Sequence, residues 1–461
     1  SVPGAAVAVV AGDEVVFSKG YGVRAEGGAP VGTGTVFQIG SATKAFLATT
    51  LAQMVDAGAF EWDRRVIALA PEFVLFDPWV TREFRVFDLL AQRSGLRPYV
   101  NDGLTALGYD GDALIHSLRF AEPVTSFRST FGYVNIPHLL AGRIVARAAG
   151  KSDWSEVARE RIFEPLGMTA TTTTAEAIEA AADHAVGHRW TPDGVVAIPF
   201  DPSFPYGLGP AGNINSSVDD MTRWLRMLIA GGRFEGKEIV GAGTLAYTQV
   251  PKIAVNEQQS YAMGWVVHET PNGRIVWHNG GTNGFGAHVG FVPHLGVGIV
   301  VLSNAENRGF PDGVAAAFYQ ALLGNPPFDV LASALEHARK TEEEKKAKFP
   351  PPASPRPVRD LAVYAGRYDT LGLGRAEVAV EEGGLVLRLE ETGAELALSP
   401  FDGDVFTVRL KPEGRFAPVV AAWGDEPVGF AQFQIDAEGR LADLHWTFGD
   451  DHYLFDRVEE R

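Results

Sequence analysis

The sequence predicts an α+β fold in which strands at both ends of a first domain enclose a helical insert, followed by a small all-β domain. Three observations support it: alternating apolar runs at the N-terminus and again from Tyr261, a helix-rich stretch between them, and short alternating runs after Asp360. A length of 461 residues agrees with two or three domains. Hydrophobic residues make up 46%, which suffices for a large core.

The elements of the first domain follow from its local patterns. A strand pair, Val2–Val10 with Glu14–Tyr21, is predicted around the turn Gly12–Asp13. An apolar face predicts a helix over Ala42–Ala57 that ends at Gly58. The middle, about 60–250, is predicted to be helical and rich in loops. The later elements are a helix at Ile136–Ala149, strands at Ala262–His268, Arg274–His278, Phe285–Phe291 and Val297–Leu302, and a closing helix at Gly313–Leu323.

A charged run followed by prolines predicts a linker between the two domains. The run is Glu336–Lys348, and the prolines are Pro350, Pro351, Pro352, Pro355 and Pro357. We place the first domain at 1–335, the linker at 336–359 and the second domain at 360–461.

The second domain is predicted to be a small antiparallel β-barrel or sandwich of about eight short strands. Glu382–Gly384 and Asp402–Gly403 are typical of hairpin turns. The expected strands include Ala376–Val380, Leu385–Leu389, Glu395–Leu398, Val405–Val408, Val419–Ala422 and Gly429–Ile435.

Composition and charge exclude several classes of protein. The formal net charge of −17 argues against nucleic-acid binding, and no apolar run approaches the roughly 20 residues of a membrane-spanning helix. The lack of Cys excludes disulfides and a cysteine nucleophile. Residues 361–461 contain 20 Asp and Glu but only 9 Lys and Arg. This excess of negative charge either increases solubility or favours substrates that carry an amine. Because the chain begins with Ser1, we expect an upstream segment to be absent, and localisation stays open.

Ser41 and Lys44 form the first candidate catalytic pair. Ser41 lies at the predicted start of a helix, where unpaired N–H groups and the helix dipole favour developing negative charge. Lys44 lies one turn later on the same face, and burial would lower the pKa of its amine so that it could accept the serine proton. The plainer interpretation is an N-cap serine followed by an ordinary helix lysine.

Two Tyr-x-Asn motifs could supply further groups. Tyr133 and Asn135 directly precede the helix predicted at Ile136–Ala149. The Tyr133 phenol could share the proton transfer, whereas Asn135 stands where an N-cap is expected. Tyr99 belongs to the other match and could line a pocket.

The motif His-x-Gly occurs three times, and its context favours the first occurrence. His278 ends a predicted strand and precedes the glycine-rich turn Gly280–Gly284, where a backbone N–H could complete an oxyanion hole. His288 is expected to pack inside a strand, and His294 to lie in the next turn. The sequence carries no G-x-S-x-G, H-E-x-x-H or P-loop motif, so neither a metal nor a cofactor is predicted.

The order Ser41-x-x-Lys44, Tyr133-x-Asn135, His278-x-Gly280 resembles the serine β-lactamase and penicillin-binding-protein superfamily. The likeness is closest to the branch of class C β-lactamases, D-alanyl-D-alanine carboxypeptidases, D-aminopeptidases and related esterases, and covers about residues 2–325. The tail resembles the lipocalin-like barrel of some D-aminopeptidase-like members through Tyr364-Ala365-Gly366-x-Tyr368. Other matching segments are Val2-Pro3-Gly4, Ser94-Gly95-Leu96, Pro165–Met168, Ala211-Gly212, Ser216-Ser217 and Met263-Gly264-Trp265.

The resemblance implies a β-lactamase/transpeptidase-like fold, in which an antiparallel sheet flanked by helices and a helical subdomain enclose the site. It also implies acyl transfer through a covalent intermediate: Ser41 would attack a carbonyl while Lys44 and Tyr133 handle protons. The N–H groups of Ser41 and Gly281 would hold the oxyanion, and Asn135 would bind substrate or orient Lys44.

The third motif departs from the family pattern, because His278, followed by Gly280, stands where β-lactamases commonly carry Lys. A neutral histidine gives no permanent cation for a substrate carboxylate. We therefore expect a serine hydrolase of small-molecule amides or short peptides, including D-residue peptides. A carboxylesterase, a weak β-lactamase and a non-catalytic penicillin-binding sensor remain alternatives, and a homo-oligomer stays open.

Overall fold

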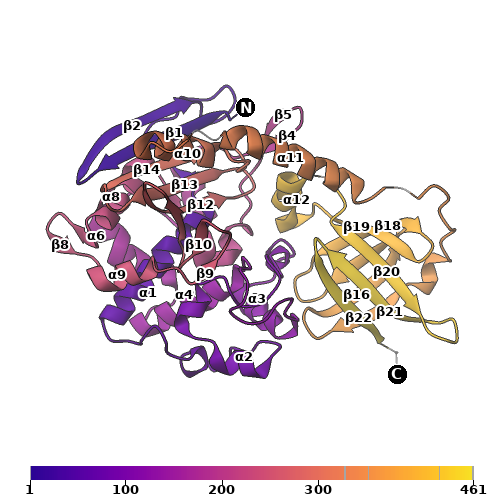
Figure 1. The fold of residues 1–461 in the computed structure, drawn as a ribbon. Helices are drawn as coiled ribbons and strands as arrows, with labels where there is room; N and C mark the ends of the chain where they lie inside the picture. The colour runs from indigo at the N-terminus through magenta and orange to yellow at the C-terminus, as the bar shows by residue number, and fades with distance from the viewer. Residues whose placement is uncertain (1, 327–328, 351, 425, 459–461) are drawn as a thin grey trace. The chain divides into compact units, whose positions relative to one another are not determined.

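The computed structural model describes residues 2–326, 329–350, 352–424 and 426–458, so Pro351 of the predicted linker and both chain ends lie outside the described residues. Contacts divide the chain into two compact units (Figure 1). The first unit comprises Ser1–Tyr99 and Glu122–Ala338, and the second comprises Val100–Ala121 and Arg339–Arg461. The domain boundaries drawn from the sequence stay predictions.

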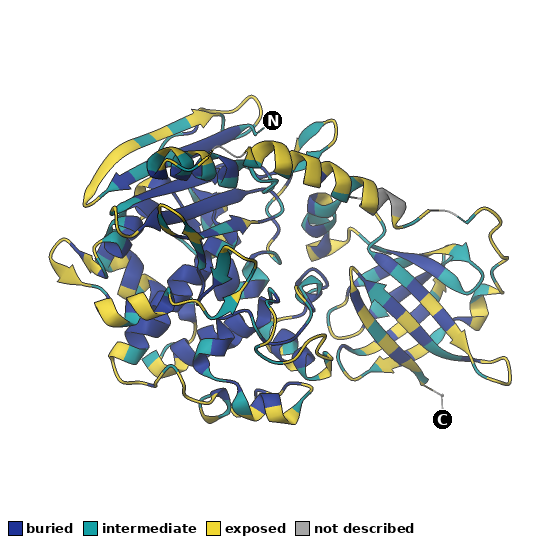
Figure 2. Cartoon of the chain, viewed as in Figure 1, coloured by how far each residue is buried: buried dark blue, intermediate teal, exposed yellow. Residues whose placement is uncertain are grey.

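An eight-stranded antiparallel sheet forms the first unit's framework, in the order β2-β1-β14-β13-β12-β11-β10-β9. The strand β14 pairs in continuous register with both neighbours, for example Ser303 with Ala5 and with Gly286. The pairing of β1 with β2, in contrast, shifts register between Val9 and Val10. Figure 2 shows the edge strand β2 largely exposed and the central strands buried. The bounds are β1 (Gly4–Ala11), β2 (Glu14–Gly22), β9 (Ile253–Ala254), β10 (Gln259–Tyr261), β11 (Val266–Thr270), β12 (Gly273–Gly281), β13 (Gly286–Val292) and β14 (Val297–Ser303).

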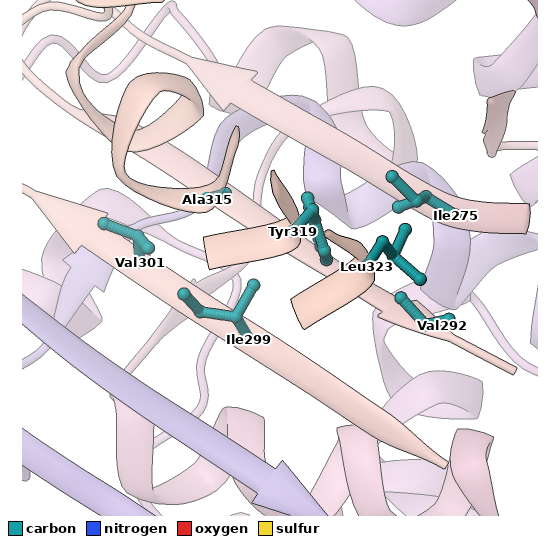
Figure 3. Packing of buried hydrophobic residues seen from close by; sticks show 7 residues of the cluster. All are labelled: Ile275, Val292, Ile299, Val301, Ala315, Tyr319 and Leu323. Atoms are coloured by element: carbon teal, nitrogen blue, oxygen red, sulfur yellow. The ribbon is translucent and has the colours of Figure 1, made fainter. Parts of the chain in front are cut away.

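Two helices pack on opposite faces of this sheet. Successive side chains of a strand point to opposite faces, and Leu225 of α8 (Val218–Ile229) lies against Gly298, whereas α10 (Phe310–Leu323) packs on Ile299. The α10 side holds a compact apolar cluster (Figure 3), made of Ile275, Val292, Ile299, Val301, Ala315, Tyr319 and Leu323. The other face carries the helical subdomain, including α1 (Thr43–Asp56), α4 (Ile136–Ala149), α5 (Trp154–Ala158) and α9 (Ala242–Thr248).

The strand predicted at Ala262–His268 is wrong in part, because a tight turn over Ala262–Trp265 separates β10 from β11. Gly264 adopts a left-handed conformation with φ +73°, which favours glycine. A Cβ there would lie 2.6 Å from the backbone oxygen of Lys44. The turn therefore lies directly against the backbone of α1, a contact that a local strand pattern does not encode.

The second unit contains a closed antiparallel barrel of eight strands, as the sequence predicts. Its core includes the fully buried Tyr364, Tyr368 and Trp446. Val419–Ala422, predicted as a strand, instead lies in the helix α12 (Ala417–Trp423), because so short an apolar run suits either state and Pro418 in its first turn favours a helix. The strands are β15 (Gly366–Thr370), β16 (Gly374–Glu381), β17 (Gly384–Leu389), β18 (Glu395–Asp402), β19 (Val405–Leu410), β20 (Gly429–Ile435), β21 (Leu441–Phe448) and β22 (Asp451–Val458).

A segment from the middle of the chain, Val100–Ala121, belongs to the barrel's unit. The backbone N–H of Asn101 donates to both carboxylate oxygens of Asp451, at 3.1 and 3.2 Å. The Tyr109 hydroxyl donates to the Leu373 carbonyl at 2.7 Å. Both bonds are buried, so they tie this segment specifically to the barrel.

Candidate active site

Ser41 and Lys44 lie in hydrogen-bonding contact. Ser41 occupies a single 3₁₀ turn, Gly40–Ala42, that leads into α1, and Lys44 lies in the first turn of that helix. Lys44 is fully buried, and its Nζ donates to Ser41 Oγ at 3.0 Å and to the Ala211 carbonyl at 2.7 Å. This geometry suits proton transfer between an amine and a serine hydroxyl.

The end of β12 packs directly against the backbone of the nucleophile's turn. A Cβ on Gly280 would lie 1.8 Å from the Ile39 carbonyl oxygen and 3.1 Å from the Ser41 nitrogen. A Cβ on Gly40 would lie 2.8 Å from the Gly281 nitrogen. The glycines thus permit the close approach of Gly281 and Ser41, whose N–H groups are predicted to hold the oxyanion.

Tyr133 lies beside this pair, on the loop before α4. The Nζ of Lys44 lies 4.8 Å from the centre of the Tyr133 ring. Tyr99 stacks obliquely on Tyr133, with ring centres 5.5 Å apart, and its backbone N–H donates to the Tyr133 carbonyl. Asn135 is buried at the N-cap position, but among the described residues its side chain makes no capping bond to α4. The structure therefore places Tyr133 next to Lys44. It also shows that the Asn135 side chain does not serve as the N-cap of α4.

His278 is buried inside β12 rather than at its end, and both ring nitrogens are engaged. Nδ1 lies 2.6 Å from the Asn279 carbonyl and therefore carries the proton, because a carbonyl only accepts. Nε2 then accepts from the Tyr261 hydroxyl at 2.9 Å. Burial, and after it the charge of Lys44, lowers the pKa of His278 to about 3, so the imidazole is neutral at pH 7. Of the other two candidates, His288 bonds to Asp312 and His294 lies in the turn before β14.

The depressed pKa of His278 makes the folded state sensitive to acid. In the unfolded chain this imidazole takes up a proton near its ordinary pKa of 6.5. In the folded chain it takes up the proton only near pH 3, so between these two values the unfolded state binds one more proton. This contribution to stability is complete above pH 6.5 and is lost as the pH falls toward 3, by up to about 1.4 kcal/mol per pH unit. His278→Gln removes this group. We therefore expect the unfolding free energy of the variant to fall less steeply with decreasing pH between 6.5 and 3, by the equivalent of about one bound proton.

Urea unfolding at several pH values between 7 and 4, monitored by circular dichroism, measures that slope. His337→Gln, on the exposed part of α11 (Val330–Ala347), serves as the matched control and should keep the wild-type slope. An unchanged slope in His278→Gln, or an imidazole that titrates near pH 6.5 by NMR, would contradict a buried neutral His278.

Three features of this site were not predicted from the sequence. Tyr261 holds the His278 ring, Gly264 supports α1, and the Ala211 carbonyl binds Lys44. Tyr261 directly precedes a segment predicted as a plain strand, so nothing indicated its role. Gly264 and Ala211 were indicated only by the resemblance, through Met263-Gly264-Trp265 and Ala211-Gly212. In the described part of the chain, no three His, Asp or Glu side chains gather as they would around a metal ion, and no helix has the length and apolarity to cross a bilayer.

Comparison with known proteins agrees with this geometry. The family model described as Beta-lactamase matches residues 1–323, and a domain of unknown function, DUF3471, matches residues 350–458. Penicillin-binding protein 4 of Amycolatopsis lactamdurans is 30% identical over 387 residues, covering 80% of this chain and 94% of the relative. Unguisins hydrolase ungD' of Aspergillus campestris is 27% identical over 468 residues, covering 93% and 85%.

Solved structures show the same fold. The octameric penicillin-binding protein homologue from Pyrococcus abyssi aligns with a TM-score of 0.63 at 22% identity, covering 99% of this chain and 96% of the homologue. A class C β-lactamase from Rhodobacter sphaeroides aligns with a TM-score of 0.56 at 23% identity, covering 74% of this chain and 95% of the enzyme. Because the Beta-lactamase match spans well over half of the sequence, the chain belongs to the β-lactamase family of serine hydrolases.

Proposed function

We propose that this protein hydrolyses small amide or peptide substrates through an acyl-enzyme formed on Ser41. The observation that carries the proposal is the 3.0 Å contact between the fully buried Lys44 amine and Ser41 Oγ. A water-excluded amine in contact with a serine hydroxyl is a suitable general base, because the proton then moves over a single short hydrogen bond.

The reaction proceeds in two acyl transfers. Lys44 in its deprotonated form takes the Ser41 proton as Oγ attacks the substrate carbonyl, and the N–H groups of Ser41 and Gly281 stabilise the oxyanion. The C–N bond then breaks, and the leaving amine receives the proton from Lys44 with the help of Tyr133. Water then attacks the acyl carbonyl and gives a proton to Lys44. The bond between the acyl carbon and Oγ breaks, Oγ takes that proton back from Lys44, and the acid and free Ser41 are released.

The environment of His278 supports substrates without a carboxylate at this position. The imidazole is neutral, and its two nitrogens are occupied by Tyr261 and the Asn279 carbonyl, so it offers no cation. This weighs against efficient binding of a β-lactam carboxylate and leaves amides and esters as the best candidates. The relative named for hydrolysis of unguisins supports a hydrolytic role. A carboxylesterase is the second candidate, because the same neutral pocket accepts esters.

Intact-mass spectrometry combined with turnover assays tests this proposal. Wild-type protein and Ser41→Ala would each be given benzylpenicillin, short-chain p-nitrophenyl esters, and D- and L-aminoacyl p-nitroanilides. We expect anilide turnover and a transient acyl adduct on the wild type alone. Turnover of esters without anilides would identify a carboxylesterase, and rapid loss of benzylpenicillin a β-lactamase. Identical behaviour of both proteins with every compound would contradict catalysis and favour a binding protein.

A further inference from the structure

A small pocket in the first unit lies next to the predicted oxyanion site and carries a buried carboxylate. It is partly open to solvent, and its accessible volume of about 10 Å³ has room for a single water-sized group, the size of an ammonium head. One wall includes Gln38, three residues before Ser41, and another includes Asn283, two residues after Gly281. A chain spans at most about 3.6 Å per residue, so the Gln38 backbone lies within about 11 Å of Ser41. By the same limit, the Asn283 backbone lies within about 7 Å of Gly281.

Asp201 is the charged group of this pocket, and only 3% of its surface is exposed. Its Oδ1 accepts from the Ser203 N–H at 2.8 Å and from the Ser203 hydroxyl at 2.5 Å, and Oδ2 accepts a long bond, 3.3 Å, from Asn283 Nδ2. The backbone N–H of Phe204 also donates to this carboxylate. Within the described residues, no Lys, Arg or His forms an ion pair with Asp201. Burial raises the pKa of its carboxyl above the ordinary value of 3.8.

A buried carboxylate without a cation destabilises the folded state, because water is removed and no opposite charge replaces it. Titratable groups with perturbed pKa values are concentrated at functional sites. At such a site a bound ligand can supply the positive charge that a buried carboxylate lacks. The remaining walls are suited to a cation: Phe200 stacks on Phe285 with ring centres 6.0 Å apart, and Phe204 completes the aromatic lining. Aromatic faces and a carboxylate together attract an ammonium group.

We propose that the Asp201 pocket binds the free α-amino group of the substrate's acyl residue. The proposal rests on the hydrolase function proposed above and makes the preferred substrate an aminoacyl amide or a peptide with a free N-terminus. The leaving amine must face Lys44 and Tyr133, which supply its proton, and neither residue lines the pocket. The pocket therefore lies on the acyl side of the scissile bond.

A matched pair of substrates tests this assignment. Alanine p-nitroanilide, as both enantiomers, and propionic p-nitroanilide differ by a single amino group. We expect Asp201→Asn to lower kcat/KM for the better alanine enantiomer at least tenfold, chiefly through KM, and to leave the propionic anilide within about twofold. Asp193→Asn, an exposed carboxylate on the turn between β4 (His188–Thr191) and β5 (Gly194–Ala197), is the matched control and should leave both values unchanged.

Equal losses with the two anilides, or no loss with alanine, would overturn the amine site. A binding measurement separates this outcome from failure of the hydrolase proposal. Calorimetry would compare alaninamide with propionamide on Ser41→Ala and on Ser41→Ala/Asp201→Asn. We expect only alaninamide to bind, only when Asp201 is present, and more weakly as acid protonates Asp201. Equal binding of the two amides would overturn the proposal even if no anilide is hydrolysed.

Discussion

Ser41→Ala and Lys44→Met are each expected to lower kcat by at least about a thousandfold, and the double variant is expected to be no slower than either single variant. The reason is that nucleophile and base act as one unit: without the Lys44 amine the Ser41 hydroxyl keeps its proton, and without Oγ the amine has nothing to activate. Methionine matches the length of lysine and tolerates burial, so the variant should fold.

Initial rates with the preferred anilide or ester, together with thermal melts of each variant, measure this coupling. Lys19→Met, on the exposed edge strand β2, makes the same chemical change away from the site and should keep wild-type rates. Losses that multiply in the double variant would show independent roles and contradict the pairing. Retention of most activity by Lys44→Met would exclude lysine as the base.

Gly280→Ala is expected to lower kcat by at least about a hundredfold, the scale of effect that a 1 Å misplacement of reacting groups can produce. The new methyl group would lie 1.8 Å from the Ile39 carbonyl oxygen. Because a Cβ is fixed to its own backbone and the Ile39 oxygen belongs to the backbone, β12 or the Ser41 turn must move. Overpacking of this kind also destabilises the folded state by about 1–3 kcal/mol.

The neighbouring glycine provides the comparison. A Cβ on Gly281 meets nothing nearer than the Asn307 Cβ at 3.4 Å, an ordinary contact, so Gly281→Ala should cost far less activity than Gly280→Ala. Gly243→Ala in the helix α9, where nothing lies within 4 Å, controls for the substitution itself. Kinetics and urea unfolding of the three variants measure these effects. Equal losses at Gly280 and Gly281 would contradict the steric explanation.

Features that depend on neighbours in the sequence were predictable. Ser41 and Lys44 are one helical turn apart, so their spacing alone indicates that their side chains meet. The strands of the sheet and most of the barrel follow from apolar alternation, because a half-buried strand needs a period of two. Val419–Ala422 shows the limit of this reasoning, since four apolar residues suit a buried helix as well as a strand.

The sequence by itself determined the α+β class, the run of short antiparallel strands in the second domain and the chemical identity of the Ser41–Lys44 pair, because periodicity and helical spacing are local properties. Only the tertiary structure decided which groups surround that pair. It placed Tyr261 on His278, the Gly264 turn on α1 and Asp201 in an aromatic pocket, and it assigned Val100–Ala121 to the barrel's unit. These partners lie far from one another along the chain, and their meeting follows from packing and burial, for which the sequence carries no short-range signal.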